Sequence, residues 1–177
     1  MKKIIKLKEL EFKNIIENVL LKEQDNTFEK EEALVHYLLE NEDEEVGLSN
    51  LKKSRYGHYG LELYEVGNKE WAIGTEEEVN KAAAEYIKET AWAFNKDFII
   101  QHSKILDFDE GSERILDAVQ AECESGNCAI LKLIDNIDEF VEDAIQSDGR
   151  GHFLSGYDGE EHEQVINGNY YYIYRIN

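Results

Sequence analysis

Apolar residues recur at every third or fourth position in several stretches of the chain, which is the spacing of one face of an α-helix. Residues 7–23 and 27–45 both show this pattern, and Thr27 is the predicted N-cap of the second stretch because acids follow it in the first turn. We interpret His36 as a residue at the boundary of the apolar stripe of this helix rather than as a ligand. That stripe consists of Leu34, Val35, Leu38 and Leu39.

The strongest helical pattern covers residues 75–95, "TEEEVNKAAAEYIKETAWAFN". Thr75 and Glu78 have the spacing of a capping box, in which each residue satisfies a backbone N–H group at the start of a helix. Asn95 is suited to end the same helix. The aromatic residues near this end are interpreted as core residues: Trp92, Phe94 and Phe98.

Four more stretches follow before the last glycine-rich region. The apolar spacing predicts helices over residues 96–106, 112–124 and 136–147. Residues 127–136 fit either a strand or a helix.

Strict alternation, typical of half-buried strands, appears in two places. Residues 61–66 and 70–74 flank a Gly-Asn turn, and the tail "EEHEQVINGNYYYIYRIN" contains an Asn-Gly turn, so both predict β-hairpins. In the last strand Tyr170, Tyr172, Tyr174 and Ile176 share one face, and Tyr171, Ile173 and Arg175 share the other. A basic aromatic face can stack nucleic-acid bases, but only Arg175 is basic here, so a core or interface role is favoured.

These elements predict one α+β domain with about five helices packed on small antiparallel hairpins. We expect a helical N-terminal lobe over residues 1–50 and an α+β core with a C-terminal β-hairpin over residues 51–177. A chain of 177 residues, of which 42% are hydrophobic, is long enough for one packed core. No apolar run reaches the roughly 18 residues of a membrane span, and the start lacks the apolar centre of a secretory signal, so a cytoplasmic location without a membrane partner is expected.

Charge changes this picture, because 39 acids stand against 19 bases and the net charge is −20. Acids concentrate in residues 23–50 and 119–148, whereas residues 1–22 are basic. Such a chain repels nucleic acid and suits a basic protein partner. The surface area expected for a protein of this mass corresponds to about 450 Å² per net charge. The surface area per charge of B-DNA is on the order of 100 Å², so the protein's average charge density is several-fold lower. Mimicry of nucleic acid would therefore require the acids to gather on one face.

Two other sequence patterns resemble functional motifs but do not match them. Cys123 and Cys128 are separated by four residues, which matches neither a redox CxxC motif nor half of a zinc site. Residues from Asp107 resemble the start of a calcium loop, but Gly111 falls at the fifth position and Ser112 occupies the place of the required glycine. Nucleotide-binding and hydrolase motifs are also absent from the sequence, so no cofactor and no resident metal are expected.

The stretch "DGRGHFLSGYDGEEHE", residues 148–163, collects the densest set of polar donors. Its glycines favour a shaped turn, with Arg150 pairing to Asp148 or Asp158 and "GHFLS" extended like a strand. A binding surface around Arg150, His152 and Asp158 is the second interpretation. A metal or acid–base site built on His152, Asp158 and His162 is the third, since two His and a carboxylate suit zinc or iron.

The helix end "WAFN", the "RGHFL…YDG" element and the tail "YYIYRIN" resemble a group of bacteriophage and prophage proteins. The similarity covers roughly residues 71–177. It implies a small phage accessory protein, and no catalytic residue can be carried over, because no activity is attached to the group.

Three hypotheses for the function follow. The first is an accessory protein that acts by protein–protein interaction, such as an anti-defence inhibitor (anti-CRISPR or anti-restriction) whose acidic face imitates nucleic acid. Its partner would be a host nuclease or nucleic-acid-binding defence protein, without direct contact to nucleic acid. The second, less favoured, is the small metal-dependent or acid–base enzyme, and the third is a self-assembling structural protein that forms homo-oligomers through its tyrosine-rich tail. The expected binding-surface residues are Arg150, His152, Asp158, Glu160, Glu161, Glu42, Asp43, Glu44 and Glu45.

Overall fold

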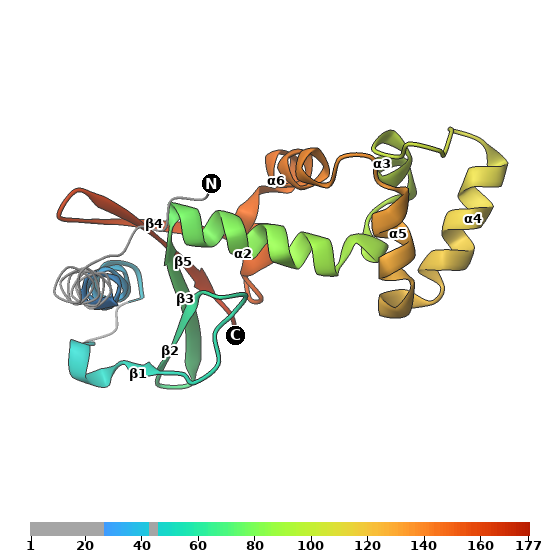
Figure 1. The fold of residues 1–177 in the computed structure, drawn as a ribbon. Coiled ribbons are helices and arrows are strands. Elements are labelled where there is room, and N and C mark those ends of the chain that lie inside the picture. The colour runs from blue at the N-terminus through green and yellow to red at the C-terminus, as the bar shows by residue number, and fades with distance from the viewer. Residues whose placement is uncertain (1–26, 43–45) are drawn as a thin grey trace, which may run out of the picture.

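The computed structural model describes residues 27–42 and 46–177, and within them six α-helices accompany one five-stranded antiparallel sheet (Figure 1). This confirms the predicted α+β class. One helix covers residues 27–41. The remaining elements are η1 (Leu48–Asn50), β1 (Lys52–Lys53), β2 (Glu62–Val66), β3 (Lys69–Thr75), α2 (Glu76–Glu89), η2 (Ala91–Ala93), α3 (Lys96–Gln101), α4 (Glu110–Gln120), η3 (Cys123–Gly126), α5 (Asn127–Leu133), α6 (Ile137–Leu154), β4 (His162–Ile166) and β5 (Asn169–Arg175).

Both predicted hairpins are present, and they join into a single sheet with the strand order β1-β2-β3-β5-β4. The join is the antiparallel pairing of β3 with β5, in which Trp71 lies opposite Arg175 and Ile73 opposite Ile173. The β4–β5 turn has positive φ at Asn167 and Gly168, as the predicted Asn-Gly turn requires. The sequence showed each hairpin, whereas the pairing between them is a property of the tertiary structure.

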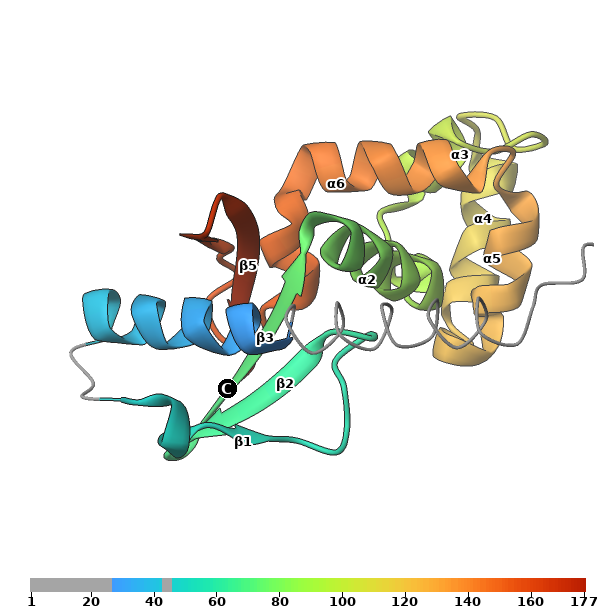
Figure 2. The same ribbon diagram turned by 60° about the vertical axis from the view of Figure 1, so that its left-hand side comes forward.

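The sheet is covered on both faces, as Figures 1 and 2 show. On one face the helix of residues 27–41 contributes Leu34 and Leu38 to a core with Trp71 and Ile173. On the other face α2 packs with Ala72 and Tyr174. Successive strand residues point to opposite faces, so the alternating tail is buried on both sides. Tyr171 and Tyr174 are core residues, as is Ile173 between them, whereas Tyr170 is exposed and Tyr172 half-buried.

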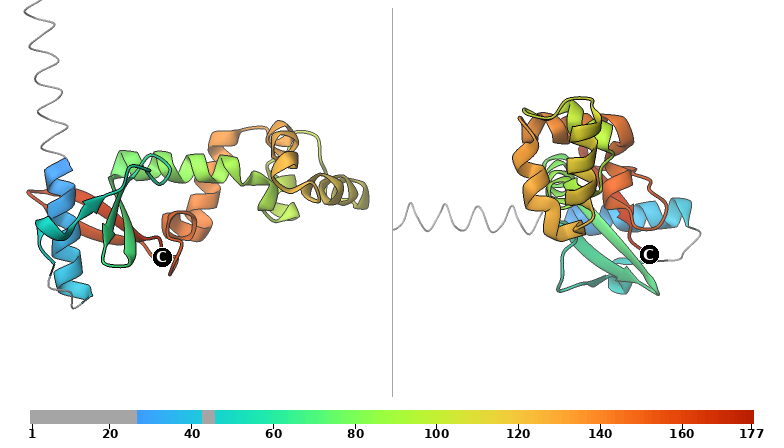
Figure 3. Two further views of the ribbon diagram at one scale, coloured as in Figure 1. Left: turned by 90° about the horizontal axis from the view of Figure 1, so that it is seen from below. Right: turned by 90° about the vertical axis from the view of Figure 1, so that its right-hand side faces the viewer.

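A second body of structure consists of helices alone and lies beyond the end of the sheet (Figure 3). It contains α3, α4 and α5, and its core includes Ile99, Leu116 and Ile130. The long helix α2 connects both parts, because Val79 packs in the sheet core and Ile87 in the helical core. The segment 127–136, which fitted either a strand or a helix, begins with the helix α5.

Two predicted helix ends are wrong. Thr27 is already helical, and its hydroxyl donates a hydrogen bond to Glu62 (3.4 Å) instead of capping the helix. Asn95 does not end α2, which stops at Glu89. Instead, its side chain accepts a hydrogen bond from the Asp97 N–H and is the N-cap of α3. The predicted helix 112–124 spans Glu110–Gln120, after an N-cap at Asp109.

The capping box of α2 is confirmed, with the Glu78 carboxylate accepting from the Thr75 N–H at 2.8 Å. No helix in residues 27–42 and 46–177 is long and apolar enough to cross a membrane.

Candidate aromatic pocket

A kink in α6 shapes the candidate site. Gly149 has φ +78° and ψ +157°, a conformation that interrupts the helix and that residues with a side chain strongly disfavour. The helix therefore has a long first arm up to Asp148 and a short second arm from Arg150 to Leu154, and the change of direction is visible in Figure 2. The stretch predicted as a strand, "GHFLS", is thus mostly helical, because its residues up to Leu154 form the second arm.

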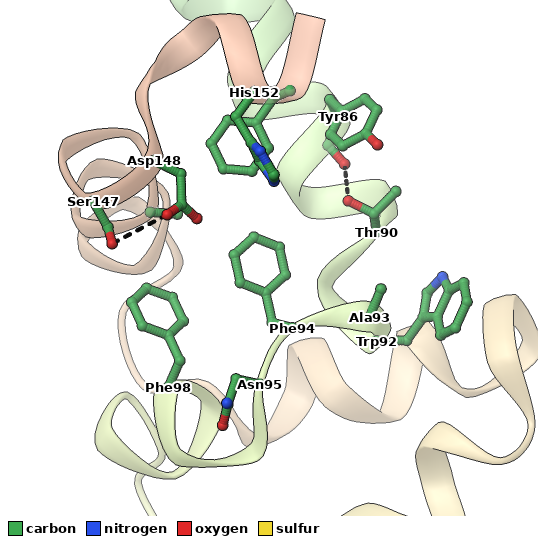
Figure 4. A pocket seen from close by; sticks show the side chains of 12 residues that line it. Tyr86, Thr90, Trp92, Ala93, Phe94, Asn95, Phe98, Ser147, Asp148 and His152 are labelled. Atoms are coloured by element: carbon green, nitrogen blue, oxygen red, sulfur yellow. Dashed lines mark hydrogen bonds between the residues drawn. The ribbon is translucent and has the colours of Figure 1, made fainter. Parts of the chain in front are cut away.

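Beside the kink lies a pocket of about 550 Å³ (Figure 4). The first arm of α6 contributes Ser147 and Asp148, and the second arm contributes His152 and Phe153. The opposite wall comes from the end of α2, from η2 and from α3. The full lining is Tyr86, Thr90, Trp92, Ala93, Phe94, Asn95, Phe98, Ala144, Ser147, Asp148, His152 and Phe153.

Aromatic rings form the floor of this pocket. Phe94 is the centre of the group, with ring centroids 5.5 Å from Phe98 and 6.2 Å from Phe153. A further ring, Phe140, lies behind them, 5.0 Å from both Phe94 and Phe98. Offset and tilted pairs at these distances are favourable ring geometries. The aromatic floor of the pocket is therefore formed by packing within the protein and does not depend on a ligand.

Two polar side chains hold the irregular segment that carries Trp92 and Phe94. Gln120 donates hydrogen bonds from its amide nitrogen to the carbonyl oxygens of Trp92 and Phe94, both at 2.7 Å. Asn127 accepts from the Trp92 N–H (3.0 Å) and donates to the Lys88 carbonyl (2.8 Å). These bonds satisfy backbone groups that leave the regular helix at this point. The Trp92 indole N–H, in contrast, is buried without an acceptor in the described part of the chain.

The polar edge of the pocket is formed by Asp148 and His152. In Figure 4 the Asp148 carboxylate points into the space bounded by His152, Phe94 and Phe98. Its hydrogen-bond partner among the described residues is the hydroxyl of its neighbour Ser147, at 3.3 Å. His152 is exposed and its ring contacts Phe153 edge-on, with centroids 5.0 Å apart.

Arg150 points away from the pocket and is enclosed between α2 and the C-terminal hairpin. It donates to the Glu161 carboxylate from Nε (2.8 Å) and Nη2 (2.7 Å), and from Nη1 to Glu76 (2.8 Å). The Tyr172 ring lies 4.4 Å from the guanidinium carbon. Burial by itself lowers the pKa of Arg150, but the hydrogen bond to Glu161 and the negative charges of Glu161 and Glu76 together outweigh it and hold the pKa above its usual value. The expected pairing of Arg150 with Asp148 or Asp158 is therefore wrong.

Asp158 and His162 lie in and after the loop that precedes β4. Asp158 accepts from the Ser155 hydroxyl at 2.7 Å and from the Glu160 N–H at 3.0 Å, and it lies 3.8 Å from His162 Nε2. Although partial burial acts in the opposite direction, these bonds lower the pKa of Asp158. The His162 ring stacks on Tyr37, with centroids 4.7 Å apart.

The structure does not join His152 to these residues. No hydrogen bond or ion pair links His152 to Asp158 or His162 within the described ranges. Among the same residues, no three His, Cys, Asp or Glu side chains are grouped so that they could hold a metal ion. Cys123 and Cys128 are both exposed and free.

The other expected surface residues are dispersed. Glu160 is exposed, whereas Glu161 is engaged with Arg150. Glu42 pairs with Lys69 at 2.7 Å. Asp43, Glu44 and Glu45 lie outside the described residues.

The sequence pattern indicates His152 as a candidate residue but does not reveal the pocket beside it. Trp92, Phe94 and Phe98 were interpreted as core residues, and they are half-buried because one side of each faces the pocket. Asp148 was interpreted only as a turn residue. One sequence signal for this site is the Asp148-Gly149 pair at the end of an amphipathic helix. It indicates that the helix is interrupted there, directly after a carboxylate.

Comparison of the chain with protein-family models, with curated proteins and with solved structures gives no match, so the geometry of this pocket is the basis for any functional proposal.

Proposed function

We propose that the protein works by binding a partner protein, and that the aromatic pocket is the point of contact. The observation that carries the proposal is the pocket itself, which has a volume of about 550 Å³, five large aromatic side chains in its lining and one carboxylate at its edge. Pockets that take a ligand group typically measure roughly 300–1,000 Å³. Aromatic side chains are also enriched at the centres of protein interfaces.

The surroundings of His152 support binding over catalysis. A histidine that acts as a general base needs a proton donor within reach and usually a carboxylate that orients its ring. Among the described residues, His152 has Phe153 as its ring contact and no hydrogen-bonded carboxylate. It therefore fits a residue at the rim of a binding pocket.

The charge of the chain supports a basic partner. With a net charge of −20, the protein attracts positively charged surfaces and repels nucleic acid. Nucleic-acid-binding proteins present such surfaces. The proposed role is therefore that of a phage-type accessory protein that binds a nucleic-acid-binding host protein, such as a defence nuclease.

The described acids of the two blocks lie on separate elements. Those of the first block lie mostly on the helix of residues 27–41, which covers one face of the sheet, whereas those of the second block lie on η3 and mostly on the first arm of α6, on the other side of the molecule (Figure 2). Several acids are also neutralised, as Glu42 is by Lys69 and Asp138 by Lys88. Imitation of nucleic acid along a single face is therefore a weaker version of the proposal than a local contact at the pocket.

The proposal is tested by filling the pocket. Ala93 lines it and is exposed, so Ala93→Phe adds a ring without removing a core contact. The control is Ala121→Phe, which adds the same ring at an exposed position outside the lining. Partners recovered from a bacterial lysate are identified by mass spectrometry, purified, and titrated with each variant.

We expect the wild type and Ala121→Phe to bind one partner with equal affinity and Ala93→Phe to bind it at least about tenfold more weakly, a loss of 1.4 kcal/mol or more. Equal binding by all three proteins would remove the pocket from the interface. Recovery of no partner above the level of empty beads would overturn the binding function.

A further inference from the structure

The wall of the aromatic pocket is suited to a cation. Tyr86, Trp92, Phe94, Phe98 and Phe153 all contribute to its lining. The face of an aromatic ring carries a partial negative charge and attracts an ammonium or guanidinium group within about 6 Å. Planar cations gain additionally by stacking on such rings.

The single carboxylate of the lining has no positive partner among the described residues. The pocket lining includes Asp148 but no lysine or arginine. Asp148 accepts a hydrogen bond from Ser147, and no described cation forms an ion pair with it. The lining therefore contains a carboxylate and no lysine or arginine, which favours a cationic ligand over an anionic one.

The same helix extends this field beyond the pocket. Glu139 and Glu142 are exposed on the first arm of α6, which ends at Asp148. Charges of one sign along a cleft raise the local concentration of ligands of the opposite sign. A basic segment would therefore be drawn along α6 toward the pocket.

We propose that the pocket takes the side chain of an arginine from the partner protein, with the guanidinium stacked on the aromatic wall and paired with Asp148. Arginine fits better than lysine because its guanidinium is planar, stacks on rings and binds a carboxylate through two parallel hydrogen bonds. This inference rests on the proposed binding function and names the chemistry of the residue that the partner inserts.

The test uses short neutral peptides with one central arginine, lysine or citrulline, titrated into the ¹⁵N-labelled protein. Citrulline has the shape of arginine without its charge. The readouts are the chemical shifts of the Trp92 indole N–H and the Ser147 amide, two residues on opposite walls of the pocket, and the dissociation constant from each titration. Free L-arginine is a separate titration.

We expect the arginine peptide to shift both signals and the citrulline peptide to bind about tenfold more weakly or worse. Asp148→Asn should weaken the arginine peptide by a similar factor. Glu163→Gln removes an exposed acid on β4, outside the pocket lining and outside α6, and it should change the affinity less than twofold, as a screened surface charge does.

Equal affinity for arginine and citrulline, unchanged binding by Asp148→Asn, or shifts confined to other surfaces would each overturn the inference. Binding of free L-arginine as tight as that of the peptide would assign the site to a small molecule instead of a partner's side chain. If Ala93→Phe loses the partner while Asp148→Asn retains it fully, the binding function stands and the arginine assignment falls. If Ala93→Phe also retains the partner, the pocket is not the point of contact and the arginine assignment falls with it.

Discussion

Arg150 and Glu161 form a two-pronged ion pair that ties the second arm of α6 to the start of the C-terminal hairpin. The guanidinium donates through Nε at 2.8 Å and Nη2 at 2.7 Å, and the Arg150 side chain is only 12% exposed. Tyr174 donates its hydroxyl to the same carboxylate. His152 and Phe153 of the second arm line the pocket, so this ion pair also fixes the position of one side of the pocket.

Replacement of Arg150 by lysine should lower the free energy of unfolding by about 2 kcal/mol, because lysine cannot make two parallel bonds in a mostly buried site. The matched control is Arg114→Lys, since Arg114 pairs with Glu110 at 3.5 Å on an exposed face of α4. Urea denaturation measures both. A loss in Arg114→Lys as large as that in Arg150→Lys would contradict the role assigned to the buried pair.

Replacement of Gly149 by alanine should destabilise the protein by about 1–3 kcal/mol, because positive φ with extended ψ is accessible almost only to glycine. No atom lies within 4 Å of the position that a Cβ would occupy, so backbone strain is the cause. Gly47→Ala is the comparison and should leave stability nearly unchanged, because Gly47 has an ordinary φ of −115° and a Cβ there would lie no closer than 3.7 Å to Asn50. Thermal unfolding of the two variants distinguishes strain at the kink from a general effect of losing a glycine.

Lys30 is a buried cation between two carboxylates. Its side chain is 3% exposed, and Nζ lies 2.7 Å from Glu78 and 3.1 Å from Glu62. Lys30→Met should cost about 3 kcal/mol, because it leaves Glu78 without its cation and leaves the mostly buried Glu62 with Lys53 alone. Lys81→Met removes an exposed lysine on α2 that lies 3.9 Å from Glu85, and it should leave stability nearly unchanged. Similar chemical denaturation midpoints for the two variants would refute the difference.

His58 should make stability depend on pH. Its Nε2 forms a hydrogen bond with the Leu154 carbonyl at 3.0 Å, at the end of α6. Burial lowers the pKa of His58 below its ordinary 6.5, although the bond to Leu154 opposes the effect. The unfolded chain therefore takes up a proton that the folded protein resists, and the free energy of unfolding falls as the pH drops below about 6.5.

The measurement is the free energy of unfolding at pH 7.5 and pH 5.5. His58→Gln should lose less stability than the wild type between these two values, whatever its stability at pH 7.5. His36→Gln changes an exposed histidine on the helix of residues 27–41 and should retain the wild-type difference. An unchanged difference in His58→Gln would exclude His58 as its source.

The N-terminal end of α2 and the β4–β5 turn show why some elements could be predicted. The capping box of Thr75 and Glu78 joins residues three positions apart, and the turn at Asn167 and Gly168 depends on two adjacent residues. Both choices are local, so the sequence carries the whole signal. At the other end of α2 the prediction of Asn95 as the last residue was wrong. The chain turns there because Gln120 and Asn127, both distant in the sequence, bond its free backbone groups.

In the glycine-rich stretch 148–163, too, local features could be predicted from the sequence, whereas contacts between distant residues could not. Its glycines do mark special backbone, since Gly149 and Gly159 have positive φ. At Gly151 the reason is close approach, because a Cβ there would lie 2.4 Å from the Gly159 carbonyl oxygen. Arg150 and His152 lie on different sides of the second arm because residues two apart on a helix are roughly 200° apart around its axis. The orientation of that arm depends on the kink at Gly149, and no residue spacing in the sequence specifies the direction of a kink.

By itself, the sequence determined the α+β class, the order of most helices and strands, the two hairpins and the strongly acidic charge, because periodicity, caps and turns depend on neighbouring residues. Only the tertiary structure decided that the hairpins pair through β3 and β5. It also decided that Arg150 is a structural residue and that Asp148 and His152 face a pocket with Trp92 and Phe94. Those outcomes depend on which surfaces of distant segments bury one another, and this is a property of packing in three dimensions.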